Sequence, residues 1–473
     1  MPKKSNPPTS QPEAASDLTR REAVQAAGAA AVAATLIAKV DGFPAIQKVR
    51  AANSTVGYGV IGTGGRGSYH LDHFKNVDGG RCVAICDIDD ANLKKGLEKA
   101  PDKPATYKDY RELLSRKDID AVVIATPIFT HFPITKDAML AGKHVFCEKS
   151  LVFQPQEVHE LRQMTNERPK QTMQVGLQRR YSEFYQTAKQ MVQKGMIGEV
   201  THVYAQWHRS GLGRTWTPPA WRCFKKYSGG LVGELGSHQI DIADWMFDSH
   251  PEFVTGVGGI DHFKDGRDVY DNVQLIFKYP KGQRLTASYI STNKHLSLFQ
   301  GTRTEFGELI MGKDGTIEIT VGTDNEPAIG LWYYEPGPKV EAAGKKKEKS
   351  ASATASLLST GRGGRPLPIL LSKDQMSDQD SFLSKEMKFA RRWLYQKGVM
   401  TPEETRNPVD TQLDSFLECV RSGKKPVADI EIGLADSTAV ILANLAMDEG
   451  RRVYMNEIHN MGKPGGAPPA KKA

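Results

Sequence analysis

The sequence predicts an α/β protein in two parts, a doubly wound domain followed by an α+β domain with an open, mainly antiparallel sheet. Three observations support this prediction. A glycine-rich turn follows a short apolar strand near residue 62, strand and helix patterns alternate from there to about residue 176, and later strand patterns follow one another without alternating helices. Alternation indicates a parallel sheet covered by helices, whereas consecutive strands indicate antiparallel pairing.

The glycine-rich turn is the first element with a chemical implication. Tyr58–Ile61 has the pattern of a short strand, and it is followed by the run Gly62, Thr63, Gly64, Gly65, Arg66, Gly67. In such a turn the first glycine permits the tight bend, the second lets the backbone approach a pyrophosphate, and the third lets the next helix pack on the strand. The N–H groups at the start of that helix face the phosphates. A glycine turn without a ligand is the alternative.

The next strand favours the nucleotide-binding interpretation. The apolar run Cys82–Cys86 leads into Asp87, which stands 20 residues after Gly67. A carboxylate at this spacing accepts hydrogen bonds from both ribose hydroxyls and repels a 2′-phosphate. We therefore expect a Rossmann domain over residues 55–176 whose cofactor is NAD rather than NADP.

The alternation continues through the rest of this domain. Helix patterns cover 107–116, 131–143 and 155–168, and apolar strand patterns cover 120–127, 144–149 and 171–176. Ligands of doubly wound sheets bind beyond the carboxyl ends of the strands. Thr126, Pro127, Glu148 and Lys149 fall at those ends, so we expect them at the cofactor.

The second part, residues 177–455, carries the consecutive strand patterns. They cover 199–208, 253–260, 272–279, 284–292 and 316–321. Residues 336–380 differ, because they combine three consecutive lysines with Ser/Ala-rich stretches, and they predict a solvated, largely disordered insertion. Residues 460–473 are rich in Gly, Pro and Lys and predict a tail.

Charge and cysteine content limit the partners. The formal net charge is +8, but the excess of Lys and Arg lies in residues 1–50, in 339–365 and in the tail after Met461. Nucleic-acid binding requires a basic face on the folded domain, so we do not expect it. The five cysteines have neither paired nor zinc-binding spacing, so we predict no disulfide framework and no metal site.

The N-terminus carries a targeting pattern. Arg20 and Arg21 precede an Ala-rich apolar stretch from about Ala23 to Ala38. A basic segment before a short apolar one is typical of a signal peptide, and the arginine pair favours the twin-arginine route. The stretch is short for a bilayer span. We expect residues 1–45 to be a signal peptide and linker, the protein to be exported to a bacterial periplasm, and the mature chain to lack a stable membrane span. An amphipathic or disordered arm is the alternative.

Several motifs form an ordered set along the chain. They are the Gly62–Gly67 turn, Asp87, Ala125–His131, Glu148–Ser150, Gly229–Trp245 and the closing segment 414–453. This set resembles the Gfo/Idh/MocA oxidoreductases, a family that includes glucose–fructose oxidoreductase and inositol dehydrogenases. The resemblance spans about Val56 to Tyr454 apart from the insertion. It implies a Rossmann domain and a substrate domain on an open antiparallel sheet whose other face forms an oligomer interface, so a homodimer or homotetramer is expected. It also implies that His131 contacts the cofactor.

The resemblance further implies catalytic residues. The lysine of the Glu-Lys motif, here Lys149, reaches the cofactor ribose and the reacting hydroxyl, and His238 matches the catalytic histidine, whose ordinary pKa suits proton transfer near neutral pH. Glu234 stands where the family often has Asp and would orient His238 or share its proton. Asp241 would support the imidazole from the substrate side. Ser150 replaces the proline of the family pattern, which makes the turn less rigid. An exposed lysine, a backbone-bonded histidine and structural or surface carboxylates are the alternatives.

Aromatic and basic residues of the second part are the expected substrate contacts, suited to stack on or hydrogen-bond a polyol. They are Trp207, His208, Trp221 and Tyr227, together with Arg179 and Arg180 after the last Rossmann strand. Packing or surface roles are the alternative for each.

These features favour an NAD-dependent oxidoreductase that acts on a secondary hydroxyl of a sugar, cyclitol or glycoside. Because no free NAD pool is expected outside the cytoplasm, the cofactor should stay bound and be recycled in the site. One alternative is a glycosidase or lyase that uses bound NAD transiently, by oxidation, elimination and reduction. Another is a non-catalytic protein that binds NAD or sugar.

Overall fold

The computed structural model describes residues 55–209, 216–291, 306–320 and 406–461, together with the backbone of two strands at 329–334 and 367–370. The predicted signal peptide at residues 1–45 lies outside the described residues, as do most of the predicted insertion at 336–380 and most of the tail at 460–473.

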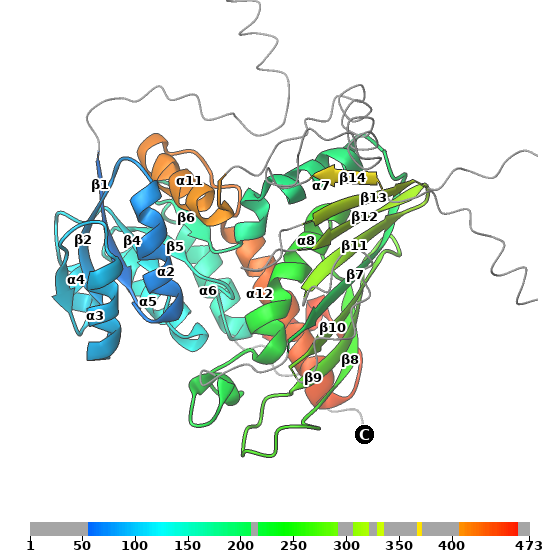
Figure 1. The fold of residues 1–473 in the computed structure, drawn as a ribbon. Coiled ribbons are helices and arrows are strands. Elements are labelled where there is room, and N and C mark those ends of the chain that lie inside the picture. Colours follow the sequence, from blue (N-terminus) through cyan, green and yellow to red (C-terminus); the bar gives the residue numbers. More distant parts are fainter. Residues whose placement is uncertain are drawn as a thin grey trace, which may run out of the picture. The chain divides into compact units, whose positions relative to one another are not determined.

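A six-stranded parallel sheet organises the first domain (Figure 1). Its strands are β1 (Val56–Ile61), β2 (Gly80–Cys86), β3 (Ala105–Tyr107), β4 (Ala121–Ile124), β5 (His144–Cys147) and β6 (Met173–Val175). They lie in the order β3-β2-β1-β4-β5-β6, so the direction of winding reverses beside β1. Doubly wound sheets bind ligands at this reversal. The predicted Rossmann fold is confirmed.

Helices cover both faces of this sheet because its central strands are apolar on both sides. Ala121 and Val123 of β4 belong to one buried cluster, while Val122 and Ile124, which alternate with them, belong to another. The helices of this domain are α2 (Gly65–His73), α3 (Asp90–Lys99), α4 (Tyr110–Leu114), α5 (His131–Leu140) and α6 (Pro155–Asn166), with short 3₁₀ turns η1 (Phe74–Asn76) and η2 (Ile128–Thr130).

The end of the chain returns to complete this first domain. Helix α11 (Pro408–Ser422) lies beside α2 and β1 (Figure 1), and its Phe416 and Leu417 share a buried cluster with Tyr58 and Val60 of β1. The expected boundary at residue 177 would assign α11 to the second domain, but the helix packs on the first.

The next helix, α12 (Ile430–Glu449), joins the two cores. Its Leu434 is buried among Rossmann residues, whereas Ala443 and Ala446 are buried in the core of the second domain. Among the described residues α12 alone is long and apolar enough to cross a membrane, and 67% of the apolar window is buried inside the protein. Strand β15 (Val453–Tyr454) and helix α13 (Met455–Met461) follow it.

A nine-stranded sheet organises the second domain. Its remaining strands are β7 (Val200–His208), β8 (Phe253–Gly259), β9 (Asn272–Lys278), β10 (Arg284–Ile290), β11 (Phe306–Gly312), β12 (Gly315–Thr320), β13 (Ile329–Tyr334) and β14 (Leu367–Leu370). The order is β14-β13-β12-β11-β7-β10-β9-β8-β15, and every neighbouring pair is antiparallel except β7 and β10. The predicted mainly antiparallel sheet is confirmed. Leu367–Leu370 lies inside the segment expected to be largely disordered, and it forms a strand because its backbone pairs with β13.

One face of the large sheet is covered by α7 (Glu183–Gln193), α8 (Ser237–Phe247) and α12 (Figure 1). Almost every residue of α8 is buried, polar ones included. A π-helical segment, η6 (Val232–Gly236), leads directly into α8, and the 3₁₀ turns η3 (Gln178–Tyr181) and η5 (Trp221–Cys223) precede α7 and η6 in the chain. Such segments are where this chain presents its polar side chains to the interior.

Candidate active site

The glycine turn after β1 has the geometry that a dinucleotide requires, and three of its glycines contribute to that geometry. Gly62 has a φ of +87°, which side chains rarely permit. A Cβ on Gly67 would lie 1.7 Å from the carbonyl oxygen of Gly62, so only glycine lets α2 approach β1 this closely. A Cβ on Gly65 would meet no protein atom within 4 Å. That open space lies at the start of α2, where Gly64 supplies no capping side chain, so the first N–H groups remain for a phosphate.

Asp87 is held at the end of β2 by main-chain donors. The N–H of Thr63 donates to Oδ2 at 2.8 Å and the N–H of Asp89 donates to Oδ1 at 2.9 Å. The Thr63 side chain turns away, since its hydroxyl donates to the carbonyl of Asn92 at 2.9 Å. The carboxylate therefore faces the position that a ribose takes in this fold, and Thr63 contributes only its backbone.

A single cavity of about 790 Å³ connects the glycine turn with the second domain. The predicted site residues that line it are Gly62, Gly64, Gly65, Arg66, Asp87, Thr126, Pro127, His131, Glu148, Lys149, Trp221, Glu234 and His238. The predicted site residues that do not line it are Thr63, Gly67, Arg179, Trp207, His208 and Asp241. The volume is within the usual range for small-molecule and cofactor sites. The open cradle at Gly65 and the carboxylate of Asp87 thus suit a bound dinucleotide.

Glu148 anchors the turn after β5. Its Oε1 accepts hydrogen bonds from Arg66 Nε and His70 Nε2, each at 2.7 Å. Burial alone would raise the pKa of Glu148, but the Arg66 guanidinium and His70 outweigh it and hold the pKa well below its usual value. Burial, together with Arg66, lowers the pKa of His70 to about 4. Arg66 also donates from Nη2 to Gln178 and lines the cavity, so its predicted contact with the cofactor stays a prediction.

Lys149 follows Glu148 and reaches across to the second domain. Its Nζ donates to the carbonyl oxygen of Glu234 at 2.6 Å, with that of Gly233 at 3.4 Å. Both carbonyls belong to the π-helical segment η6, whose wider turn exposes them. Burial lowers the pKa of Lys149, while Glu234 and Glu148 oppose this. The peptide bond between Lys149 and Ser150 is cis.

His238 stands at the first turn of α8, beside Lys149 in the same cavity. Its ring lies nearly parallel to that of Trp207, with centroids 6.2 Å apart. Burial lowers the pKa of His238 well below its usual value, and the charges of Lys149 and Arg179 lower it further. Its Nδ1 is buried with no hydrogen-bond partner among the described residues. The surroundings of His238 therefore favour the neutral form of the imidazole.

Glu234 presents one free carboxylate oxygen. Its Oε2 accepts from Arg222 Nε at 3.0 Å, whereas Oε1 is buried and unpartnered within the part of the chain that the structure describes. Such an atom is costly unless a ligand or water completes it. Glu234 and His238 each therefore leave a polar atom that this part of the protein does not satisfy.

His131 proves to be a link between two turns. Its Nδ1 lies 2.7 Å from the carbonyl oxygen of Ser150 and its Nε2 lies 2.9 Å from that of Thr126. Burial lowers the pKa of His131, while the two carbonyl oxygens, which accept hydrogen bonds from a ring N–H, oppose this. The ring thereby ties the end of β4 to the Lys149 turn.

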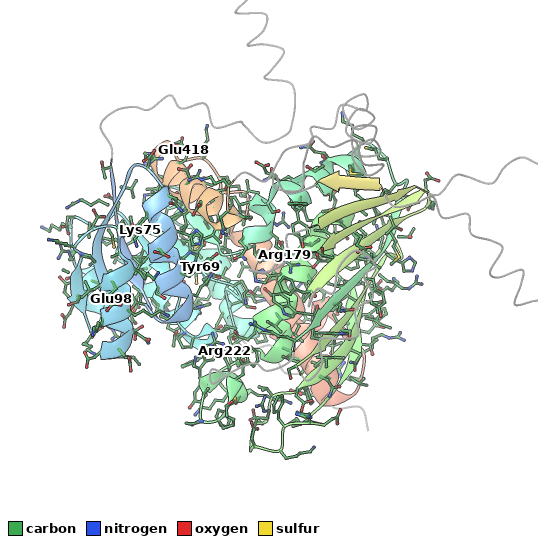
Figure 2. The ribbon with its side chains drawn as sticks, viewed as in Figure 1. Tyr69, Lys75, Glu98, Arg179, Arg222 and Glu418 are labelled. Carbon is green, nitrogen blue, oxygen red and sulfur yellow. The ribbon has the colours of Figure 1, made fainter. Side chains whose placement is uncertain are left out.

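Six residues expected at the substrate do not line the cavity: Arg179, Arg180, Trp207, His208, Tyr227 and Asp241. Arg179, labelled in Figure 2, is buried in an ion pair with Glu308 of β11. Arg180 pairs with Asp241 at 2.7 Å, and the Tyr227 ring packs against that of Phe129 with centroids 4.9 Å apart. His208 points to the opposite face of β7 from Trp207, where it contacts Ser288 Oγ at 2.9 Å. Trp207 itself stacks on Phe306 behind His238 rather than lining the cavity.

Sequence reasoning missed three contributors, Arg222, His70 and Gln178. Arg222 and Gln178 line the cavity, and His70 bonds Glu148. Arg222 follows Trp221, a residue that was expected at the substrate, and this neighbour was the sequence signal that could have identified Arg222 as a site residue. His70 and Gln178 act through tertiary pairing with residues 78 and 112 positions away in the chain, which no local pattern reveals.

The described residues contain no group of three or more His, Cys, Asp or Glu side chains placed to hold a metal ion. The fold and the cavity define an oxidoreductase with a dinucleotide-binding domain, and the comparisons agree. The description "Oxidoreductase family, NAD-binding Rossmann fold" matches residues 56–177, and the GFO/IDH/MocA C-terminal domain matches residues 185–318. Together the two matches cover more than half of the chain. The chain belongs to the GFO/IDH/MocA family of NAD-dependent oxidoreductases.

Curated relatives include sugar-alcohol dehydrogenases and a glycosidase. Inositol 2-dehydrogenase of Rubrobacter xylanophilus is 29% identical over 57% of this chain and 73% of its own length. Inositol 2-dehydrogenase of Gluconacetobacter diazotrophicus is 31% identical over 42% of this chain and 56% of its own. Glycosyl hydrolase family 109 protein 2 of Shewanella sp. (strain ANA-3) is 35% identical over 38% of this chain and 42% of its own. The chain thus spans about half the length of most of these relatives.

Solved structures share the fold. Aldose-aldose oxidoreductase from Caulobacter crescentus, complexed with glycerol, superposes with a TM-score of 0.62 over 85% of this chain and 99% of that one, at 20% identity. Scyllo-inositol dehydrogenase from Lactobacillus casei, with bound NAD(H) and scyllo-inositol, gives a TM-score of 0.59 over 85% of this chain and 100% of that one, at 17% identity.

Proposed function

We propose that this protein oxidises or reduces a secondary hydroxyl of a sugar, cyclitol or glycoside with a tightly bound NAD. One observation carries the proposal: a single cavity joins the glycine turn and Asp87 to Lys149, Glu234 and His238. The glycine turn, Asp87 and the turns at Thr126 and Glu148 would hold the cofactor. The residues at the other end of the cavity would then meet the reacting hydroxyl.

The protein's own part in such a reaction is to orient the hydroxyl and to move its proton. NAD, when bound, supplies the capacity to accept or return a hydride. Lys149 has a lowered pKa, so a larger share of it is neutral and ready to take a proton than in a free lysine. The surroundings of His238 favour the neutral imidazole, which donates a hydrogen bond from one ring nitrogen and accepts one at the other. The free oxygen of Glu234 accepts from a neighbouring hydroxyl.

NAD is favoured over NADP by the surroundings of Asp87. Both of its oxygens accept hydrogen bonds from main-chain N–H groups, which fix the carboxylate at the end of β2. A carboxylate beside the ribose accepts from the 2′-hydroxyl and repels a 2′-phosphate.

A second candidate is NAD-assisted cleavage of a glycoside. The Shewanella glycosyl hydrolase family 109 protein, at 35% identity, favours it. Oxidation next to the anomeric centre acidifies a neighbouring C–H, and a proton acceptor such as Lys149 or His238 would serve the elimination as well as the oxidation. The same cavity therefore suits both candidates.

We further propose that the protein is exported by the twin-arginine route with its cofactor loaded, and that it works as a homo-oligomer. The basis is the N-terminal sequence, with Arg20 and Arg21 before an apolar stretch. Retention of the cofactor would allow one substrate to be oxidised and another reduced without an external NAD pool.

Native mass spectrometry of the purified protein tests the central proposal, since it gives bound cofactor and subunit count together. One NAD(H) per chain is expected, and acid or heat should release it. Incubation with a panel of sugars, inositols and p-nitrophenyl glycosides then separates the candidates. Bleaching or appearance of bound NADH absorbance supports the dehydrogenase, and glycoside cleavage without net NADH supports the second candidate. A protein free of nucleotide, or one that binds sugars with no turnover, contradicts both.

A further inference from the structure

Arg222 has no part in the chemistry described above, yet it contacts Glu234, which does, and Trp221, which lines the same cavity. Its Nε donates to Glu234 Oε2 at 3.0 Å, and its guanidinium carbon lies 4.3 Å from the centre of the Trp221 ring. Arg222, Trp221 and Glu234 all line the cavity (Figure 2 labels Arg222). An arginine that stacks on an aromatic ring is restricted by this contact, so the plane of its guanidinium group has a defined orientation.

The backbone that carries Arg222 is fixed from several sides. The N–H of Asp268 donates to the Cys223 carbonyl at 3.1 Å, and the N–H of Lys225 donates to Asp268 Oδ1 at 2.6 Å. Lys225 in turn pairs with Asp448 near the end of α12. The loop is thus tied to the segment between β8 and β9 and to α12, and Arg222 reaches Glu234 from this anchored backbone.

The ion pair leaves Glu234 with one occupied and one free oxygen. The Glu234 side chain is only 9% exposed, and its Oε1 has no partner among the described residues. Its main-chain carbonyl accepts from Lys149 at 2.6 Å. A buried carboxylate with a single charged partner takes the orientation which that partner dictates. Removing Arg222 would leave both oxygens of Glu234 without a donor in this part of the chain.

The charge of Arg222 also reaches Lys149. Burial is the main cause of the lowered pKa of Lys149, and Arg66 and Arg222 lower it as well, whereas Glu234 and Glu148 raise it. The charged or titratable groups that face Lys149 come from every element packed around it. They are Arg66 of α2, Glu148 of its own turn, Arg222 of η5, Glu234 of η6, His238 of α8 and Asp436 of α12.

We propose that Arg222 is a positioning residue. It holds the Glu234 carboxylate so that the free oxygen of Glu234 meets the reacting hydroxyl, and its positive charge offsets the negative charge of Glu234 beside Lys149. This inference rests on the proposed function. It assigns to the loop after residue 216 a role in proton transfer rather than in sugar binding alone.

Steady-state kinetics of Arg222→Gln, Arg222→Lys, Glu234→Gln and the double variant test the proposal. We expect Arg222→Gln to lower kcat about 10- to 100-fold with a much smaller change in KM, since catalytic positioning is lost rather than ground-state binding. The acidic limb of the pH profile for oxidation should move to higher pH, because the pKa of Lys149 rises when the positive charge of Arg222 no longer lowers it. Arg222→Lys keeps the charge and should restore most of that limb. In the Glu234→Gln background, Arg222→Gln should add little.

Three outcomes would overturn the proposal: additive effects in the double variant, an unchanged pH profile, or a rise in KM alone. The last would make Arg222 a substrate-binding residue. A readout without substrate keeps this test separate from that of the proposed function. The protonation of Lys149 can be followed by NMR of protein labelled at lysine Cε, assigned with Lys149→Arg. Arg222→Gln should raise that pKa even if no substrate has been found, and an unmoved pKa contradicts the inference.

Discussion

The two ends of the cavity are built on different principles. At the cofactor end each carboxylate already has its donors: Asp87 accepts from two main-chain N–H groups, and Glu148 accepts from Arg66 and His70. At the substrate end Glu234 and His238 each leave a buried polar atom without a partner among the described residues.

This difference indicates which kind of ligand each end of the cavity suits. The cofactor end is preorganised by glycine geometry and backbone, so binding there costs little rearrangement. The substrate end keeps unsatisfied groups, which are expensive in an empty protein but become useful when hydroxyl groups supply the missing partners. Selectivity for a polyol over an apolar molecule follows from that cost.

The largest expected effect on stability comes from a substitution that disrupts the cofactor end. Gly67→Ala places a Cβ 1.7 Å from the Gly62 carbonyl oxygen, so α2 or β1 must move. We expect a loss of at least about 3 kcal/mol in the free energy of unfolding. Gly65→Ala is the matched control, because its Cβ meets no protein atom within 4 Å. It should keep the melting temperature of the nucleotide-free protein but lose bound NAD. Thermal melts and NAD content measure both, and equal behaviour of the two variants would contradict the assignment of the cradle.

The next largest expected effect is on kcat and comes from a substitution at the substrate end. His238→Ala should lower kcat by about 10²- to 10⁴-fold, as expected for loss of a proton-transfer group, while bound NAD stays stoichiometric. His208→Asn is the control, since His208 lies outside the cavity and contacts Ser288. It should leave kcat unchanged. Turnover retained in His238→Ala would remove this histidine from catalysis.

Cofactor choice should depend on the cofactor end alone. Asp87→Ser removes the charge beside the ribose, so NAD affinity should fall by roughly tenfold, which equals ~1.4 kcal/mol, and NADP should gain. The ratio of NAD(H) to NADP(H) released from purified protein measures this change. An unchanged ratio would mean that other residues select the cofactor.

The smallest effect concerns a carboxylate behind the substrate end. Asp436 of α12 is 1% exposed, and neither oxygen has a partner within the described residues. Burial, together with Asp241 and Asp244, raises its pKa well above the usual value. Between the unfolded and folded pKa values the folded protein binds more protons, so this group makes stability fall as pH rises. Asp436→Asn should therefore raise the melting temperature by a few degrees, and by more at pH 8 than at pH 5.

Glu98→Gln, on the exposed surface of α3, is the control for this titration and should change neither the melting temperature nor its pH dependence. A lower melting temperature for Asp436→Asn at both pH values would show that the carboxylate is ionised and paired.

The cofactor end could be predicted from sequence because its determinants are local. The Gly62–Gly67 turn, Asp87 and the strand ends at Thr126 and Glu148 are fixed by spacing within a repeating strand–helix unit. The same alternation predicted the parallel sheet, and its absence after residue 177 predicted the mainly antiparallel second sheet.

The substrate end could be predicted only in part. His238, Glu234 and Trp221 line the cavity as expected, but Arg179 and Asp241 are held in buried ion pairs whose partners are set by tertiary packing. The adjacent residues Trp207 and His208 had to face opposite sides of one strand, so they could not both reach a ligand. Arg222 was missed because its meaning depends on Glu234, twelve residues later and in a different element.

Helix α11 has a consequence for how the protein acquires its cofactor. Phe74 already stacks on Tyr58 of β1, but Phe416 and Leu417 complete the cover of that face. During synthesis the nucleotide fold therefore emerges early, while its core is completed only after α11 has left the ribosome. We accordingly expect a fragment that ends near residue 177 to expose apolar side chains of β1 and to be prone to association.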